Sequence, residues 1–598
     1  MSIRISRTEI ESFVGDVAPL WLVSEENLKF ARIVWSSTGD AVKVKKFSGC
    51  YHGAFGYGVL LTFMEPGEAV VTATCRDETY TCLVRSKARR DYSGEKMNFY
   101  KGDLHSHTSK EHVHDKFIAR TEALYPDYLE YIKKENLRDL AVITDHSETI
   151  DHENFFRGFT AYDEMREDME PIVYPGCESE IQYVEPDRFG RLHRRSGELI
   201  TLNANNFSQS NTYEEFLTAY TDSPFVIGIF PHPHIIGVST KGVWDYRPRL
   251  NNSKAMRDLI KYVEVLGNPR KENMLHEYVY SEALDGGYRV STTCSSDFHS
   301  AWDFNAYPGA TVIMAPEKTR EAFTDSLLNL RAYACESGNI KLTYSVNGLT
   351  APCDLPLADK YHFKVEIDYF EENKSTRPVR CDVISDGGVT VKSFEDVNFE
   401  SFEFDVESST ARWFYLRFVD SNTKRTFSCP VFTGREVIPY KIDDLVPIDY
   451  KTLKITDADG SDASALVDGD TLTVWRGTAP RCSLTIDMGC VRKVSALGNY
   501  GVSIVPPPST PETVGRVQGE LEAGFPTEYV ISASVDGVNF EKCAEGVFRT
   551  FTGEEIVRFA PREARYVRLD VLSTTGSRLG REAYVNIPVN IAELSLFE

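Results

Sequence analysis

Eleven of the thirteen histidines in this chain of 598 residues lie between His105 and His299. Most of them belong to short clusters of residues that commonly bind metal ions, and several clusters directly follow an apolar run. Imidazole nitrogens and carboxylate oxygens hold Zn, Mn or Fe at neutral pH. A fold that uses this pattern must bring several strand ends together, so we expect a multi-metal site at the mouth of a barrel. The clusters are Asp103–His107, Thr144–His146, Gly176–Glu178, Pro231–His234 and Ser296–His299.

The segment from about residue 98 to residue 338 alternates between apolar runs and stretches typical of helices. The runs include Leu140–Thr144, Phe225–Phe230 and Tyr262–Leu266. Continuous apolar strands that alternate with helices predict a parallel sheet or barrel. Barrels of this class place their active sites at the carboxyl ends of the strands, where the clusters lie.

The rest of the chain has the alternating pattern of β-structure. A chain of this length is too long for one hydrophobic core and predicts about three to five domains. We expect β-sandwich modules at residues 1–95, 340–445 and 449–598, and the first resembles bacterial immunoglobulin-like modules. The predicted fold class is therefore multidomain, α/β plus all-β, with a barrel at residues 98–338 flanked by β-sandwiches.

Spacing within the clusters predicts how the ligands meet. Side chains alternate along a strand with period two, so His105 and His107 point to the same side and can reach one ion. Asp297 and His299 repeat this spacing. Glu178 is the candidate bridging ligand because a carboxylate can bind two cations with its two oxygens. Two ions about 4 Å apart can clamp the attacking and leaving oxygens of a displacement.

The clusters, in this order, resemble the PHP family, named after polymerase and histidinol phosphatase. The resemblance implies a distorted (β/α)7 barrel, up to three ions of Zn, Mn or Fe, and hydrolysis of phosphate esters. It also implies that one ion is held by four residues, that His146 and His299 serve a second ion, and that His232 serves a third. The four residues of the first set are His105, His107, Glu178 and Asp297, with Glu178 bridging.

The chain departs from the family pattern at two positions. The family often has another histidine a few residues beyond the first pair, and here His112 is favoured over His114 and Asp115. The family also commonly has a histidine in the strand after the glutamate. This chain offers Asn203 there, with His193 upstream as a substitute. We therefore predict two or three divalent ions.

No GxSxG, Walker or GxGxxG motif is evident, so a metal-bound hydroxide is the simplest predicted nucleophile. The leaving group needs an acid, and the candidates are Asp145, His234 and Glu264. Asp145 has an alternative role in orienting ligands. Glu264 has an alternative role in a salt bridge at the barrel rim.

The last module carries three motifs that resemble discoidin-like modules, also called F5/8 type C or family 32 carbohydrate-binding modules. The resemblance implies a β-sandwich jelly roll that often binds sugars. Trp475 and Tyr500 are candidate sugar contacts, although Trp475 is usually a core residue at this position. Asp468 and Asp470 are candidate contributors to a structural calcium site. The motifs are Val467–Trp475, Tyr529–Phe540 and Ala564–Val571.

The formal net charge of −23 argues against binding to nucleic acid or to an anionic membrane surface, because both need a basic protein surface. No signal peptide is visible at the amino terminus and the cysteines are scattered, so we expect a cytoplasmic protein. An extracellular location stays open if a leader has been trimmed.

The leading functional prediction is a metal-dependent phosphoesterase, for monoesters or diesters, that acts on a phosphorylated carbohydrate or glycan. One alternative is a metal-dependent hydrolase of another bond, such as a glycosidic bond. The other alternative is a non-catalytic scaffold that binds glycans.

Overall fold

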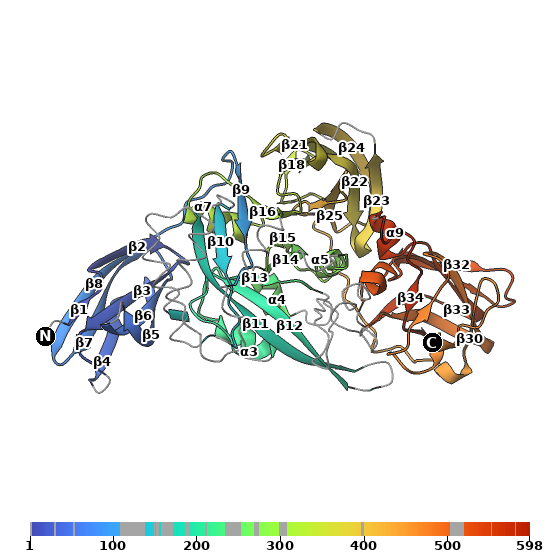
Figure 1. Ribbon diagram of the computed structural model, residues 1–598, viewed down its shortest axis with the longest axis horizontal. Helices are drawn as coiled ribbons and strands as arrows, with labels where there is room; N and C mark the ends of the chain where they lie inside the picture. Colours follow the sequence, from blue (N-terminus) through green and yellow to red (C-terminus); the bar gives the residue numbers. More distant parts are fainter. Residues whose placement is uncertain are drawn as a thin grey trace.

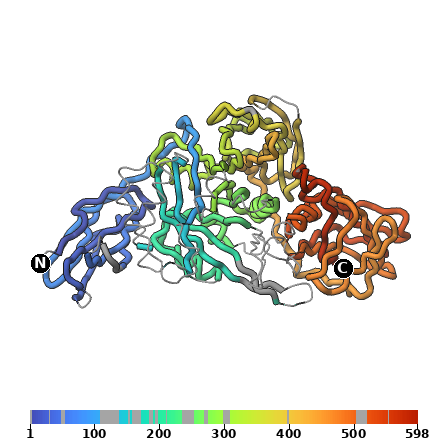
Figure 2. Tube along the Cα trace, viewed as in Figure 1, coloured from blue at the N-terminus to red at the C-terminus, as the bar shows by residue number. Residues whose placement is uncertain are grey.

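The structure consists of β-rich modules arranged side by side along the chain (Figure 1). The amino and carboxyl termini lie in modules at opposite ends (Figure 2). Within the described part of the chain, no helix has the length and apolar character needed to cross a membrane. The computed structural model describes all residues except 1–2, 29–30, 52–53, 108–137, 149, 151–154, 157–170, 187–189, 191, 210–211, 234–252, 268–273, 298–307, 396–399, 503–518, 552 and 581, and except the side chains of 48–51, 183–186, 193–196 and 374.

The N-terminal module packs two four-stranded sheets against each other, with strand orders β1-β3-β6-β5 and β2-β8-β7-β4. Alternate residues of β7 are buried, which is the pattern of a strand with one face on a core. Leu20, Leu61 and Val71 are among the fully buried residues between the sheets. The strands are β1 (Arg4–Ile5), β2 (Glu9–Phe13), β3 (Val17–Ser24), β4 (Ile33–Ser37), β5 (Val42–Tyr51), β6 (Ala54–Phe63), β7 (Gly67–Cys75) and β8 (Glu78–Lys87).

The central region is one mixed sheet with the order β15-β14-β13-β12-β11-β10-β9-β16-β17. The sheet continues through β26, β25, β22 and β23, which come from later in the chain. The central strands are β9 (Asn98–Asp103), β10 (Leu140–Ile143), β11 (Ile172–Pro186), β12 (Leu192–Leu202), β13 (Ile227–Phe230), β14 (Ile260–Gly267), β15 (Ser291–Ser295), β16 (Ala310–Ala315) and β17 (Ala332–Cys335).

The predicted (β/α)7 barrel, and with it the α/β part of the fold class, is wrong. β11 and β12 form a long antiparallel hairpin, and β13 and β16 also pair antiparallel with neighbours, so the sheet is mixed. Strands far outnumber helices among the described residues. An apolar run shows that both faces of a strand are covered, but it does not record the direction of the neighbouring strand. The α-helices of this region are α3 (Tyr213–Ala219), α4 (Lys254–Leu259), α5 (His276–Asp285) and α7 (Arg320–Leu328).

The third module places a four-stranded sheet, ordered β19-β18-β21-β24, beside the end of the long sheet. Alternate residues of β21 are buried among aromatic and aliphatic side chains. Its elements are β18 (Ile340–Val346), β19 (Leu349–Thr350), β20 (Cys353–Asp354), β21 (Lys360–Tyr369), η3 (Lys374–Thr376), β22 (Pro378–Ser385), η4 (Asp386–Gly388), β23 (Val389–Glu395), β24 (Ser401–Glu407), β25 (Trp413–Asp420), β26 (Arg425–Phe427) and β27 (Val431–Phe432).

The C-terminal module is an antiparallel β-structure around a large apolar core, with the strand order β28-β30-β33-β31-β32. β35 pairs with β30, and β29 pairs with β34. Its elements are η5 (Tyr450–Thr452), β28 (Lys454–Asp457), η6 (Ser464–Val467), β29 (Trp475–Arg476), β30 (Cys482–Tyr500), β31 (Glu528–Ser534), β32 (Glu541–Val547), β33 (Glu554–Val571), α9 (Thr575–Leu579), β34 (Asn590–Ile591) and β35 (Glu593–Phe597).

Helix α5 ties the central sheet to the two modules that follow it. Leu275 and Tyr278 pack into the apolar core of the C-terminal module. Glu277, near the start of the helix, lies within ion-pair distance of Arg417 on β25. The helix is therefore held by apolar contacts on one side and by buried charges on another.

Candidate metal centre

The clustered histidines and carboxylates converge at one edge of the central sheet. Each comes from a strand or from the residues directly after it, and consecutive strands lie side by side, so their ends meet. All of them are buried except His146, whose side chain is 20% exposed. His105 and His107 follow β9, His146 follows β10, Glu178 lies in β11, His232 follows β13, and Asp297 follows β15.

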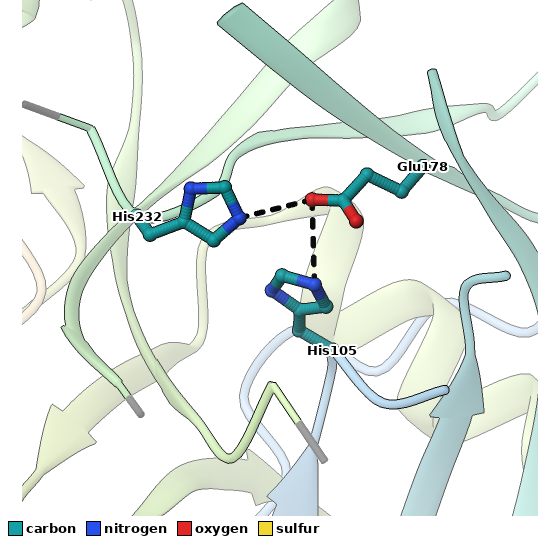
Figure 3. Close-up of side chains that lie close together, drawn as sticks. All are labelled: His105, Glu178 and His232. Atoms are coloured by element: carbon teal, nitrogen blue, oxygen red, sulfur yellow. Dashed lines mark hydrogen bonds and ion pairs between the residues drawn. The ribbon is translucent and has the colours of Figure 1, made fainter. Parts of the chain in front are cut away.

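Glu178 lies at the centre of this group (Figure 3). Its Oε1 atom is 3.1 Å from Nε2 of His232 and 3.4 Å from Nε2 of His105. Its Oε2 atom is 3.2 Å from Nδ1 of His146 and 3.3 Å from Nε2 of His107. Each oxygen therefore faces a different pair of histidines, which is the arrangement of a bridging carboxylate.

Asp297 approaches the first histidine pair from the other side. Its Oδ1 atom is 3.4 Å from Nε2 of both His105 and His107. The backbone of Asp297 has a φ of 48°, and its N–H donates to the carbonyl of His105 at 3.0 Å. His232 also has a positive φ of 21°. Non-glycine residues held in such conformations cluster at functional sites, because the surrounding structure must offset their cost.

Glu264, in β14, lies behind the first histidine and not at the open side of the centre. Its Oε2 atom is 2.9 Å from Nδ1 of His105, and its Oε1 atom accepts from the backbone N–H of His232 at 3.3 Å. The side chain is fully buried. A carboxylate in this position fixes the ring orientation and tautomer of a metal-binding histidine.

The electrostatics of the centre favour positive charge. Burial alone would lower the pKa of His105, but Glu178, Glu264 and Asp297 outweigh burial and raise the pKa to about 10. Burial alone would raise the pKa of Glu178, but His105 and His146 hold it well below its ordinary value. The Glu178 side chain is thus ionised, with positive charge from His105 and His146 beside it.

The donor set fits divalent metal ions. Three groups each offer three ligand atoms that lie within 4.8 Å of one another, so each is a candidate site for one ion, and the groups share His105, His107 and Glu178. Nitrogen and oxygen donors of this kind suit Zn, Mn and Fe. The groups are His105, Glu178 and His232; His105, His107 and Asp297; and His107, His146 and Glu178.

Three predicted site residues, His112, His234 and His299, lie outside the described residues. Asp145 is buried, and its carbonyl accepts from the N–H of Glu178 at 3.2 Å. Asn203 turns toward the N-terminal module, where its Nδ2 donates to the carbonyl of Gly15 at 3.0 Å. His193 lies in β12, in the stretch whose side chains are not described.

Sequence reasoning missed Glu198. This residue lies in β12 and is 4% exposed. Its Oε1 atom is 3.5 Å from Nδ1 of His146, and its Oε2 atom is 3.2 Å from Nε2 of His232. The available signal was an acidic residue directly before the apolar run Leu199–Leu202, because an ionised side chain there needs a buried partner.

The candidate sugar-binding residues of the C-terminal module lie close to its core. Tyr500 is 3% exposed, and Trp475 is half-buried against the apolar cluster. Asp468 and Asp470 accept hydrogen bonds within their own loop, from the backbone N–H groups of Asp470 and Leu472. The predicted calcium site stays a prediction.

No family model and no curated protein matches the chain. About a quarter of the chain is similar, at the structural level, to family 32 carbohydrate-binding modules. The Clostridium perfringens module CpGH89CBM32-5, in complex with GalNAc-β-1,3-galactose, is 19% identical with a TM-score of 0.20, and the match covers 26% of this chain and all of that one. The module of C. perfringens NanJ, in complex with galactose, is 23% identical with a TM-score of 0.20, and the match covers 26% of this chain and 99% of that one.

A third similar structure is the C-terminal domain of a chitobiase from Bacteroides fragilis, 20% identical with a TM-score of 0.18, covering 25% of this chain and 96% of that one. These likenesses say nothing about the ligand of this chain. They also give no support to the resemblance between residues 98–338 and the PHP family, which rests on the motif residues.

Proposed function

We propose that this protein is a metal-dependent hydrolase that acts on a carbohydrate-containing substrate. One observation carries the proposal: buried histidines and carboxylates from adjacent strands converge around Glu178, with ligand atoms at mutual distances that fit metal ions. A purely structural role for so many buried ionisable groups would be costly without cations to neutralise them.

Divalent ions bound at this centre would supply Lewis-acid activation of water and substrate. The protein's own residues hold and orient the side chains that would bind these ions. Glu264 fixes the ring of His105 from behind, while the hydrogen bond from Asp297 to the carbonyl of His105 fixes the spacing of their strand ends. His146 is the exposed member of the group, so the substrate approaches from its side.

The bond that is hydrolysed has two candidates. A glycosidic bond, or another bond of a glycan, agrees with a C-terminal module whose sequence motifs resemble carbohydrate-binding modules. A phosphate ester, in monoester or diester form, has the support of the histidine and carboxylate motifs alone. We favour the glycan substrate and treat the phosphate ester as the second candidate.

A substrate screen tests the catalytic proposal. The full chain, loaded in turn with Mn, Zn or Fe, is assayed on aryl glycosides, aryl phosphate monoesters and aryl phosphodiesters. We expect turnover that His107→Ala abolishes, because this change removes a ligand shared by two of the three donor groups. The matched control is His362→Ala, an exposed histidine in the third module, which should retain full activity. Turnover that survives His107→Ala would refute the proposed centre.

A binding experiment tests the glycan part separately. The full chain is titrated calorimetrically with galactose and with GalNAc-β-1,3-galactose, in the presence and absence of a chelator. We expect binding that is independent of metal and of His107→Ala. If glycan binds but no substrate class is turned over by any metal form, the protein is a glycan-binding scaffold and the hydrolase proposal fails.

A further inference from the structure

The metal centre contains another buried glutamate, Glu198, whose contacts with histidines parallel those of Glu178. Glu178 and Glu198 come from the antiparallel strands β11 and β12, and both are buried. The hairpin register pairs Glu198 with Glu180, so Glu178 and Glu198 lie close together along the ladder. This closeness is a consequence of the hairpin, which the expected barrel would not have produced.

Both carboxylates divide their oxygens between the same two histidines. His146 Nδ1 lies 3.2 Å from Oε2 of Glu178 and 3.5 Å from Oε1 of Glu198. His232 Nε2 lies 3.1 Å from Oε1 of Glu178 and 3.2 Å from Oε2 of Glu198. Each carboxylate thus spans from one histidine to the other.

This geometry has a charge requirement. Two carboxylate groups at 0% and 4% exposure are costly to bury side by side, and cations placed between them would offset that cost. One cation on each histidine side satisfies both carboxylates at once. On the His232 side, His105 and Glu178 complete one group of candidate ligand atoms, and on the His146 side His107 and Glu178 complete another. Glu198 would add one oxygen to each group, through its contacts with His232 and His146.

We infer that Glu178 and Glu198 form a double carboxylate bridge between two divalent ions, and that Glu198 directs the centre toward Mn²⁺ or Fe²⁺ in preference to Zn²⁺. The inference rests on the proposed metal centre and adds a ligand and a metal preference to it. Carboxylate oxygen is a harder ligand than imidazole nitrogen and suits Mn²⁺ better, so a glutamate in this position moves the preference away from Zn²⁺.

Metal binding to variants at position 198 tests the inference. The variants are Glu198→Gln, which removes the charge, and Glu198→His, which supplies nitrogen. Equilibrium dialysis with elemental analysis measures Mn²⁺ and Zn²⁺ bound per chain. We expect Glu198→Gln to weaken Mn²⁺ binding by about 10- to 100-fold, on the scale seen when groups that support a metal site are lost. Glu198→His should retain binding but prefer Zn²⁺. The matched control, Glu214→Gln on the exposed surface of α3, should bind as the wild type does.

A spectroscopic measurement needs no variant and covers the case in which a substitution disturbs folding. Two Mn²⁺ ions joined by carboxylates are magnetically coupled, so the electron paramagnetic resonance spectrum of the Mn²⁺-loaded wild type should show coupled ions. A spectrum of isolated ions, or a Glu198→Gln variant that binds Mn²⁺ like the control, would overturn the bridge while leaving the metal centre standing. A wild type that binds no metal would overturn the proposed function as well.

Discussion

Asp285, the last residue of α5, gathers charges and donors from two other modules. Its Oδ1 atom accepts from Nη2 of Arg412 at 2.8 Å and from Nε1 of Trp413 at 3.0 Å. Its Oδ2 atom accepts from the backbone N–H of Gly387 at 3.0 Å and lies 2.8 Å from Nη1 of Arg549 in the C-terminal module. The Asp285 side chain is 11% exposed and that of Arg549 is 7% exposed.

We predict that Asp285→Ala destabilises the protein by about 3 kcal/mol, because it breaks a buried ion-pair network and leaves two guanidinium groups without this carboxylate. The matched control is Asp354→Ala. Asp354 also makes two contacts with guanidinium nitrogens, both of Arg289, at 2.8 and 3.0 Å, but its side chain is 68% exposed. Solvent screening should hold the cost of that change below about 1 kcal/mol.

Urea unfolding followed by tryptophan fluorescence measures both variants, and Trp413 reports directly on the site. A cost for Asp285→Ala that equals the cost of Asp354→Ala would refute the reasoning, because burial would then have no effect on the strength of these pairs.

Two further predictions concern buried contacts. Burial alone would raise the pKa values of Glu277 and Asp382, but Arg417 outweighs burial and lowers both from their ordinary values of 4.5 and 3.8. The ionised forms of both carboxyls stabilise the fold above those ordinary pKa values, and this stabilisation is lost as pH falls through the lowered values. Glu277→Gln should therefore flatten the acid side of a plot of unfolding free energy against pH, measured by urea unfolding. A plot with the same slope as that of the wild type would contradict this. Phe156 is fully buried, and its ring centroid lies 4.3 Å from that of Trp21 and 4.8 Å from that of Phe47, both in the N-terminal module. Phe156→Ala should therefore lower the free energy of unfolding by about 3–5 kcal/mol in the same assay. Phe55→Ala, at a phenylalanine that is 43% exposed, is its control and should cost far less.

Local patterns in the sequence predicted many strands but not how they pair. The apolar run Leu140–Thr144 predicted the strand that the structure has at Leu140–Ile143, and Tyr262–Leu266 predicted part of β14. The direction of β12 was not predictable from such runs, because direction depends on the connection between strands. β11 and β12 pair antiparallel as a hairpin, whereas the sequence predicted a parallel sheet or barrel.

The same limit explains what was found and missed in the metal centre. His105, His107 and Asp297 could be predicted because short-range spacing at strand ends places them on one side. The position of Glu198 near Glu178 could not be predicted in this way, because it depends on the antiparallel register of β11 and β12, which pairs Glu198 with Glu180. Its neighbours His193, Arg194 and Arg195 give that part of the sequence the polar character of an exposed hairpin.

The most direct test of the account is the metal content of the full chain, purified without added metal and then dialysed against Mn, Zn or Fe, with Glu178→Gln measured beside it. The account predicts two or three ions per chain in the wild type and a large loss in Glu178→Gln, because that carboxylate faces the four histidines of the centre that lie within the described residues. A wild type that binds no metal after reconstitution, or a Glu178→Gln variant that binds as much as the wild type, would contradict it.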